Sequence, residues 1–428
     1  MKANVAIIFL IIAALSVNHL SGQDADSARV ITRFRIDEVS KKAYEISMDT
    51  SRMELFRYNP IKKQSFTNTF LGNSGMANQS NFFWQRNPNG AFLFARPYEV
   101  YLHHPYNTPH FNTRKPYTEL KYLTSGGRDD SEQFLSALHT QNINQYANVG
   151  LFYDLIASKG VYQRQNLGSN HFNLFGSYRK KNYQMFASIN TNKIQAQENG
   201  GLSSINDFKE QAFDAVNYDV RLDNASSVLK YYSFFVTQKL DILRINDTDT
   251  SNVVRKTPFS LQHTITYNRY VKNYNDQINP ADTSGVYRNN YFLINEASDS
   301  AFHHKLSNRF SLNLDFAKET QRLQIFLKHE YKSYAFKDPA TLTYLVNDQN
   351  KDTVIYKDHQ DIYHDVSLGG QYFGILGNWE YNANGSFFMT GYRQNDIEAN
   401  INFIRYLNDK NNKVASADIF PHKNPIIL

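Results

Sequence analysis

The sequence predicts an all-β protein: an antiparallel transmembrane β-barrel, incomplete in this chain, preceded by a loop-rich N-terminal region. Three observations support this fold class. Residues 307–332 alternate apolar and polar side chains over two long stretches joined by a polar turn. Aromatic residues form 14% of the chain, which suits the aromatic girdles of membrane barrels. No segment after residue 22 is apolar for the roughly 20 residues that a spanning helix needs.

The N-terminus is typical of a secretory signal peptide, which we place at residues 1–22. Lys2 gives a positive start, residues 5–17 are an apolar run, and Ser21 and Gly22 are small residues suited to cleavage. The chain has no cysteine, so neither a disulfide nor a Cys-linked lipid anchor is available to it. Export together with a barrel fold predicts the outer membrane of a Gram-negative bacterium.

The rest of the chain divides into three predicted regions. Residues 23–116 are rich in proline and show little alternation, so we expect a loop-rich region in the periplasm or partly in the barrel mouth. Residues 407–428 are expected to be irregular. Between them, alternation bounded by turn residues predicts barrel strands over 117–406. They are expected near 117–125, 131–141, 147–157, 170–180, 182–195, 227–241, 257–273, 302–317, 321–336, 360–373, 377–393 and 396–406.

The hairpin at 307–332 shows the two faces most clearly. Successive side chains of a strand point to opposite sides, and here one side is apolar and the other polar. In its first strand Phe310, Leu312, Leu314 and Phe316 oppose Arg309, Ser311, Asn313 and Asp315. Strands of this length suit a bilayer crossing, whereas β-sandwich strands usually have about five or six residues. A soluble secreted β-sandwich is the alternative fold.

Residues 229–236 are apolar on both faces, which would suit contact with a plug or a second layer.

The connections between the predicted strands support the same topology. Those at 142–147, 179–182, 318–321 and 374–377 are short, whereas those at 195–226, 273–301 and 337–359 are long. Outer-membrane barrels have short periplasmic turns and long external loops. We therefore expect the short turns on the periplasmic side.

The polar face of the 307–332 hairpin supplies the predicted pore-lining residues. A hydrated lumen would be lined by charges of both signs, which favour small polar solutes without strong ion selectivity. These residues are Arg309, Asn313, Asp315, Gln324, Lys328 and Glu330. The alternative is a filled or plugged interior without conductance, because small barrels fill with side chains and only larger ones leave a channel.

No catalytic, cofactor-binding or metal-binding constellation is expected, and the chain is not expected to be an enzyme. Adjacent histidines, at 103–104 and 303–304, would point to opposite faces of a strand and could not easily share an ion. Ser136, His139 and Asn142 are common strand residues without a GxSxG motif. The net charge is +6, and the basic residues are not concentrated in a stripe, so no nucleic-acid partner is expected.

Several segments in order resemble one known family. Residues 48–50, 56–60, 70–75 and 111–118, followed by 131–133, 139–142, 148–151 and 160–162, are similar to the "putative porin" family of the Bacteroidetes. The resemblance implies an outer-membrane β-barrel, and hence passive diffusion of small polar solutes with no cofactor. The alternative is a non-conducting surface barrel that binds glycans or a partner protein through its long loops. Expected partners are outer-membrane lipid, small solutes and a homo-oligomer.

One feature departs from that family. Barrels of this kind usually finish with a strand that ends in an aromatic residue, whereas this chain ends Asn-Pro-Ile-Ile-Leu at 424–428. We therefore expect a C-terminally truncated member, whose sheet leaves an open edge.

Overall fold

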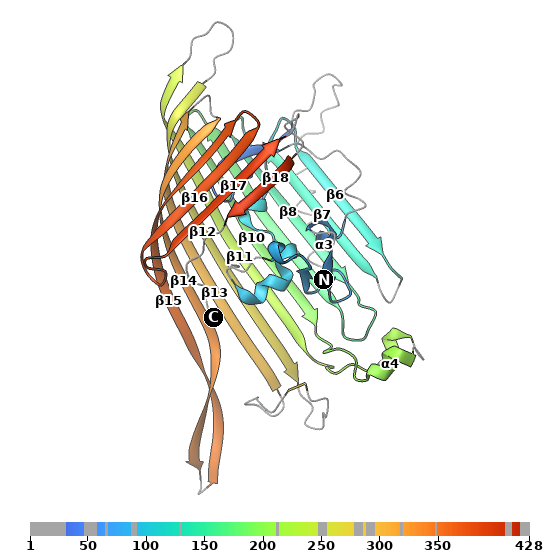
Figure 1. Cartoon of the computed structure of the whole chain (residues 1–428). Helices are drawn as coiled ribbons and strands as arrows, with labels where there is room; N and C mark the ends of the chain where they lie inside the picture. Colours follow the sequence, from blue (N-terminus) through green and yellow to red (C-terminus); the bar gives the residue numbers. More distant parts are fainter. Residues whose placement is uncertain are drawn as a thin grey trace.

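The structure is a computed structural model, dominated by one antiparallel sheet of 13 strands in chain order from β6 to β18 (Figure 1). It describes residues 31–46, 58–64, 67–86, 92–127, 131–210, 214–246, 255–277, 286–287, 296–316, 320–346, 349–406 and 413–419. The strands are β6 (Tyr117–Ser125), β7 (Glu132–Asn142), β8 (Ala147–Ser158), β9 (Leu167–Lys180), β10 (Tyr183–Gln197), β11 (Ser226–Asn246), β12 (Arg255–Gln277), β13 (Glu296–Phe316), β14 (Gln321–Val346), β15 (Gln349–Leu376), β16 (Trp379–Thr390), β17 (Ile397–Tyr406) and β18 (Lys413–Ile419). The predicted signal peptide lies outside the described residues.

The described part of the N-terminal segment, here defined as residues 31–113, contains short elements. Strands β1 (Ile31–Ile36), β2 (Ala43–Ile46) and β5 (His110–Thr113) form a three-stranded sheet in the order β2-β1-β5. The others are α3 (Pro60–Gln64), β3 (Asn68–Phe70), β4 (Asn78–Ser80) and the 3-10 helices η1 (Phe83–Gln85), η2 (Leu93–Tyr101) and η3 (Pro105–Asn107). Helices α4 (Ile205–Glu210) and η4 (Ala215–Asn217) lie in the long β10–β11 connection. Among the described residues, no helix is long and apolar enough to cross a membrane.

The predicted antiparallel architecture is confirmed, with three corrections to its strands. The expected long connection at 337–359 is wrong, because β14 and β15 stay paired as far as Val346 and Gln349. Strands β11 and β12 likewise continue beyond their predicted ends at residues 241 and 257, with register shifts after Asp241. The region 407–428, expected to be irregular, contains β18, which pairs with β17. Alternation marks only the part of a strand that has an apolar face, whereas backbone pairing continues beyond it.

The two faces of the sheet differ as the alternation predicts. Phe310 is 59% exposed on the outer face, while its neighbour Arg309 is 7% exposed on the inner face. Apolar side chains recur over the outer face of nine consecutive strands, and a soluble monomer rarely exposes so large an apolar area. Examples are Phe172, Leu174, Ile189, Phe234, Leu240, Leu261, Ile325, Leu327, Leu368, Phe387 and Phe403. Such a face suits lipid chains.

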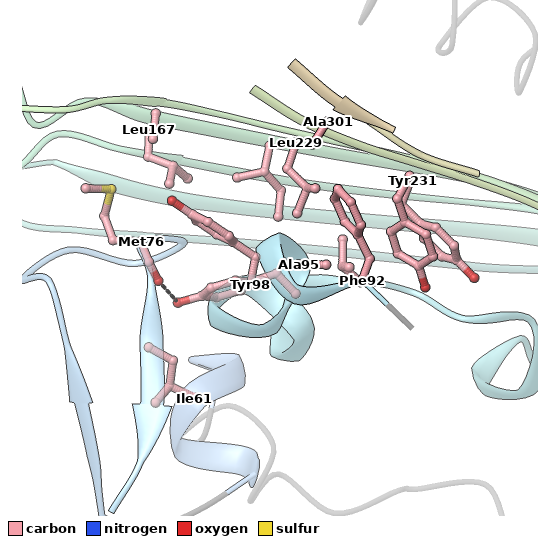
Figure 2. Close-up of a cluster of buried hydrophobic side chains, with 14 residues drawn as sticks. Ile61, Met76, Phe92, Ala95, Tyr98, Leu167, Leu229, Tyr231 and Ala301 are labelled. Atoms are coloured by element: carbon pink, nitrogen blue, oxygen red, sulfur yellow. Dashed lines mark hydrogen bonds between the residues drawn. The ribbon is translucent and has the colours of Figure 1, made fainter. Parts of the chain in front are cut away.

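The N-terminal segment packs against the inner face of the sheet through apolar side chains. Figure 2 shows Phe92 and Tyr98 beside Leu229 and Tyr231 of β11, in a cluster of buried residues. Tyr101 of η2 donates a hydrogen bond to the Met76 carbonyl, 3.1 Å away. The inward-facing side chains of residues 229–236 therefore contact the N-terminal segment, which lies against this face as a plug. A plug was one of the two contacts that the apolar pattern of these residues suggested.

Two smaller apolar contacts hold the three-stranded N-terminal sheet. Ile36 of β1 packs with Phe186 and Phe235, and Phe111 of β5 packs with Leu138 and Phe175. Each of these wall residues points inward from a strand of the large sheet. Together with the larger cluster, which reaches Ala301 of β13, these contacts bind the N-terminal segment along the inner face from β7 to β13.

The large sheet is open. Its edge strands are β6 and β18, and each pairs with only one neighbour in the described part of the chain. The expected barrel architecture is thus present as a curved open sheet (Figure 1).

Candidate functional site

The tip of the β1–β2 hairpin, residues 37–42, is shaped by local hydrogen bonds. The Asp37 carboxylate accepts from the backbone N–H and the hydroxyl of Ser40 at 2.7 and 2.6 Å. The Asp37 N–H donates to the Lys42 carbonyl at 2.8 Å, and Lys41 adopts a positive φ of 59°. An Asp side chain that binds the following backbone stabilises such a turn. The turn leaves the carbonyls of residues 39–41 free to meet the sheet.

Three consecutive carbonyls of this hairpin tip accept hydrogen bonds from three strands of the large sheet. Arg309 of β13 donates to the Val39 carbonyl at 2.6 Å. Gln324 of β14 donates to the Ser40 carbonyl at 3.1 Å, and Gln262 of β12 donates to the Lys41 carbonyl at 2.7 Å. Turn carbonyls have no partner of their own, and an unpaired buried carbonyl is costly. The inner face therefore contains a receptor for the hairpin tip.

The receptor side chains also bind one another. The Gln324 side chain accepts a hydrogen bond from Arg309 at 2.6 Å and donates one to the side-chain oxygen Oδ1 of Asn313 at 2.6 Å. The Arg309 guanidinium lies 3.7 Å from the centre of the Phe326 ring. Nearby, Arg322 donates two hydrogen bonds to Asp315, at 2.6 and 2.7 Å. A connected network of this kind fixes the orientation of each member.

A second polar group, here called the lysine cluster, lies further along the same strands. Glu330 binds Lys305, Lys328 and Lys332 at 2.9, 3.2 and 3.2 Å, and Lys332 also binds Asp365 at 3.0 Å. Three ammonium groups against two carboxylates leave one net positive charge. The inner wall is therefore of mixed sign with a small positive excess here.

All six predicted pore-lining residues lie on the inner face. The structure brings Arg309, Asn313 and Gln324 together under the hairpin tip, and it places Lys328 and Glu330 in the lysine cluster. Asp315 forms a separate pair with Arg322. Five of the six are buried, and Lys328 is half-buried. Their contact with solute remains a prediction.

Several inner-face residues were missed as site candidates although they share the same period-two signal. These are Gln262, Lys305, Arg322, Lys332 and Asp365. Alternation places each of them on the polar face of its strand. No sequence signal identified residues 39–41 as their partner, because a backbone carbonyl has no signature in the residue type.

Two basic groups of the N-terminal segment have strongly lowered pKa values. Burial, reinforced by the positive charge of Arg309, lowers the pKa of Lys41 to about 7, against the opposing effect of Glu38 and Asp37. The Lys41 ammonium donates to the Tyr106 hydroxyl at 2.7 Å. Burial also lowers the pKa of His110 to about 3. Both groups are therefore more easily accommodated in their neutral forms.

The other residues considered from sequence do not form a catalytic arrangement. Ser136 and His139 are three residues apart on β7, so they point to opposite faces. His139 instead lies 2.7 Å from the Thr118 hydroxyl. The adjacent histidines also separate: the rings of His103 and His104 contact different strands.

A family model described as "Putative porin" matches residues 30–426 of this chain. No curated protein matches. The ferric-catecholate import receptor Fiu from K12 E. coli is a similar solved structure, with 7% sequence identity and a TM-score of 0.42 over 74% of this chain and 48% of that one.

Two further similar structures are the ferric citrate transporter FecA and the siderophore receptor PirA from Acinetobacter baumannii. FecA has 10% identity and a TM-score of 0.43, covering 70% of this chain and 44% of that one. PirA has 9% identity and a TM-score of 0.42, covering 71% and 44%. The chain spans less than half the length of each of these three structures.

Proposed function

This chain belongs to the family described as "Putative porin", and on that premise we propose that it passes small polar solutes across the outer membrane by passive diffusion. Family membership assigns it to the outer-membrane barrels; the passage of solutes is our proposal. Its apolar outer face would contact lipid. Its signal peptide, regional boundaries, truncation and homo-oligomeric state remain predictions.

The observation that carries the proposal is the polar inner face. Charged and amide side chains follow one another along β12, β13 and β14, on the side opposite the exposed apolar residues. Polar groups lining a passage replace part of the hydration of a polar solute. The net positive charge of the lysine cluster would favour anions modestly over cations.

The hairpin tip lies in the way of this route. Residues 39–41 cover Arg309, Gln324 and Gln262, so these side chains bind carbonyls rather than solvent. Passage along this part of the wall requires the hairpin tip to leave its receptor. We therefore assign the hairpin tip the role of a gate.

Single-channel recording in a planar lipid bilayer tests this proposal, with Arg309→Ala as the main variant. The change removes a hydrogen bond from a charged donor, worth about 1.5–3 kcal/mol, so the gate should open roughly 10- to 150-fold more often. Arg269→Ala is the matched control, because Arg269 is an exposed arginine on the outer face of β12. Stepwise currents that rise only in Arg309→Ala support the proposal.

The second candidate is a non-conducting surface barrel that binds glycans or a partner protein through its long loops. The observation that favours it is the extensive packing of the N-terminal segment against the inner face. An inserted protein that stays electrically silent in the wild type and in Arg309→Ala would reject the porin proposal and favour this one.

A further inference from the structure

Three side chains that are distant in the sequence meet where the N-terminal segment touches the sheet. His103 lies between η2 and η3, Asp154 on β8 and His171 on β9, and their ligand atoms lie within 4.8 Å of one another. We propose that this histidine cluster binds a divalent transition-metal ion of the Zn²⁺ class and so joins the N-terminal segment to the sheet. Among the described residues, this is the group with the composition and spacing of a metal site.

The position of each ligand is fixed by its element. Asp154 and His171 are directly opposite each other in the β8–β9 register, so both point to the inner face. The backbone of His103 is held by Asn192, which accepts from its N–H at 3.0 Å and donates to its carbonyl at 3.4 Å. The His103 ring therefore meets the two wall residues in a defined place.

The hydrogen bonding of His171 leaves one ring nitrogen available. Its Nε2 lies 3.2 Å from the side-chain oxygen Oδ1 of Asn190. An amide oxygen can only accept, so Nε2 carries the proton. Nδ1 then has a free lone pair, and it is buried without a hydrogen-bond partner among the described residues. A metal-bound histidine commonly donates its other N–H to such an oxygen. Metal binding would satisfy the buried nitrogen.

Two imidazoles and one carboxylate are a known ligand set for zinc, with a fourth position left for water. Metal–ligand bonds of about 2.0–2.2 Å place tetrahedral ligand atoms roughly 3.3–3.6 Å apart. The His103 Nε2 and Asp154 Oδ2 atoms are already 3.1 Å apart.

One adjustment is required. The rings of His103 and His171 are stacked, with centroids 3.8 Å apart and an angle of 5° between planes, so their lone pairs lie in nearly parallel planes and do not converge on one point. Because the His103 side chain is 35% exposed and that of Asp154 is 24% exposed, these two can turn toward the buried His171.

Zn²⁺ titration calorimetry on the folded full chain in detergent tests the site, with Co²⁺ absorption as a second readout. We expect one Zn²⁺ per chain and a Co²⁺ spectrum typical of tetrahedral nitrogen and oxygen ligands. His103→Ala and Asp154→Asn should each weaken binding by at least about tenfold, since even second-shell changes cost 10–100-fold. His104→Ala is the matched control, because its ring contacts Tyr231 and Glu99 instead.

The variants avoid the buried His171, whose loss could prevent folding. Failure of the wild-type chain to bind Zn²⁺ would overturn the proposal. So would an affinity that is equal in the wild type, His103→Ala and Asp154→Asn, since binding would then lie elsewhere. In either case the cluster is a stacked histidine pair in which His103 contacts Asp154. Neither readout depends on conductance.

Discussion

The N-terminal segment touches the sheet in two contrasting ways. Around Phe92 the contact is apolar, with rings stacked on Tyr270 and His303. At the hairpin tip it is polar, with three carbonyls bound by Arg309, Gln324 and Gln262. Water competes for hydrogen bonds but not for buried apolar surface. The apolar contact therefore anchors the segment, whereas the polar contact is the one that can be released.

The anchor should show the largest mutational effect. Phe92→Ala removes a ring that is nearly fully buried. Such changes typically lower the free energy of unfolding by about 3–5 kcal/mol. Hydrogen exchange of the amides in η2 should accelerate correspondingly. Phe83→Ala is the control, because Phe83 belongs to the same segment but is 80% exposed. Equal exchange in the two variants would refute the assignment of Phe92 as an anchor.

The receptor for the hairpin tip should show an intermediate effect. Gln324→Ala leaves the Ser40 carbonyl and the Arg309 and Asn313 side chains each without one partner, which should cost about 1–3 kcal/mol of docking free energy. Faster proteolysis within the β1–β2 hairpin measures the loss. Gln238→Ala, on the outer side of β11, should leave proteolysis unchanged. An unaltered rate in Gln324→Ala would show that the polar contact does not hold the tip.

The smallest effect should come from pH. The pKa of Lys41 is about 7 when docked and about 10.4 when the segment is free in water, so the free form binds the extra proton between these values. Docking therefore strengthens as pH rises from 7, by about 15-fold at pH 8.5. Hydrogen exchange of the hairpin measures this, and Lys41→Met should flatten the slope. An unchanged slope in Lys41→Met would assign the pH dependence to another group.

At more acidic pH a second group acts in the same direction. The pKa of His110 is lowered to about 3 by burial, against about 6.5 in water. Docking that needs neutral His110 weakens as pH falls below about 6.5. A falling pH therefore favours release of the N-terminal segment in two separate ranges, through Lys41 between about pH 10.4 and 7 and through His110 below about pH 6.5.

Much of the sheet could be predicted from the sequence, and the hairpin at 307–332 shows why. Alternation identified its two strands, and it assigned Arg309 and Phe310 to opposite faces, as their exposures confirm. It failed at 337–359, where pairing continues, and at β18, because backbone hydrogen bonds form without an apolar face. The prediction that adjacent histidines on a strand face opposite sides agrees with His303 and His304 of β13, whose rings contact Phe92 and Tyr267 respectively. It does not apply to His103 and His104, which lie outside the strands.

Where apolar and polar residues alternate, the amino-acid sequence is enough to assign the face of each side chain, because the two-residue period of a strand is a property of the backbone. The partners of the inner face emerge only in the folded molecule. Arg309 binds a carbonyl 270 residues away in the chain, and His103 meets two residues from different strands. Such contacts depend on how the N-terminal segment docks, and no local pattern of residues specifies that docking.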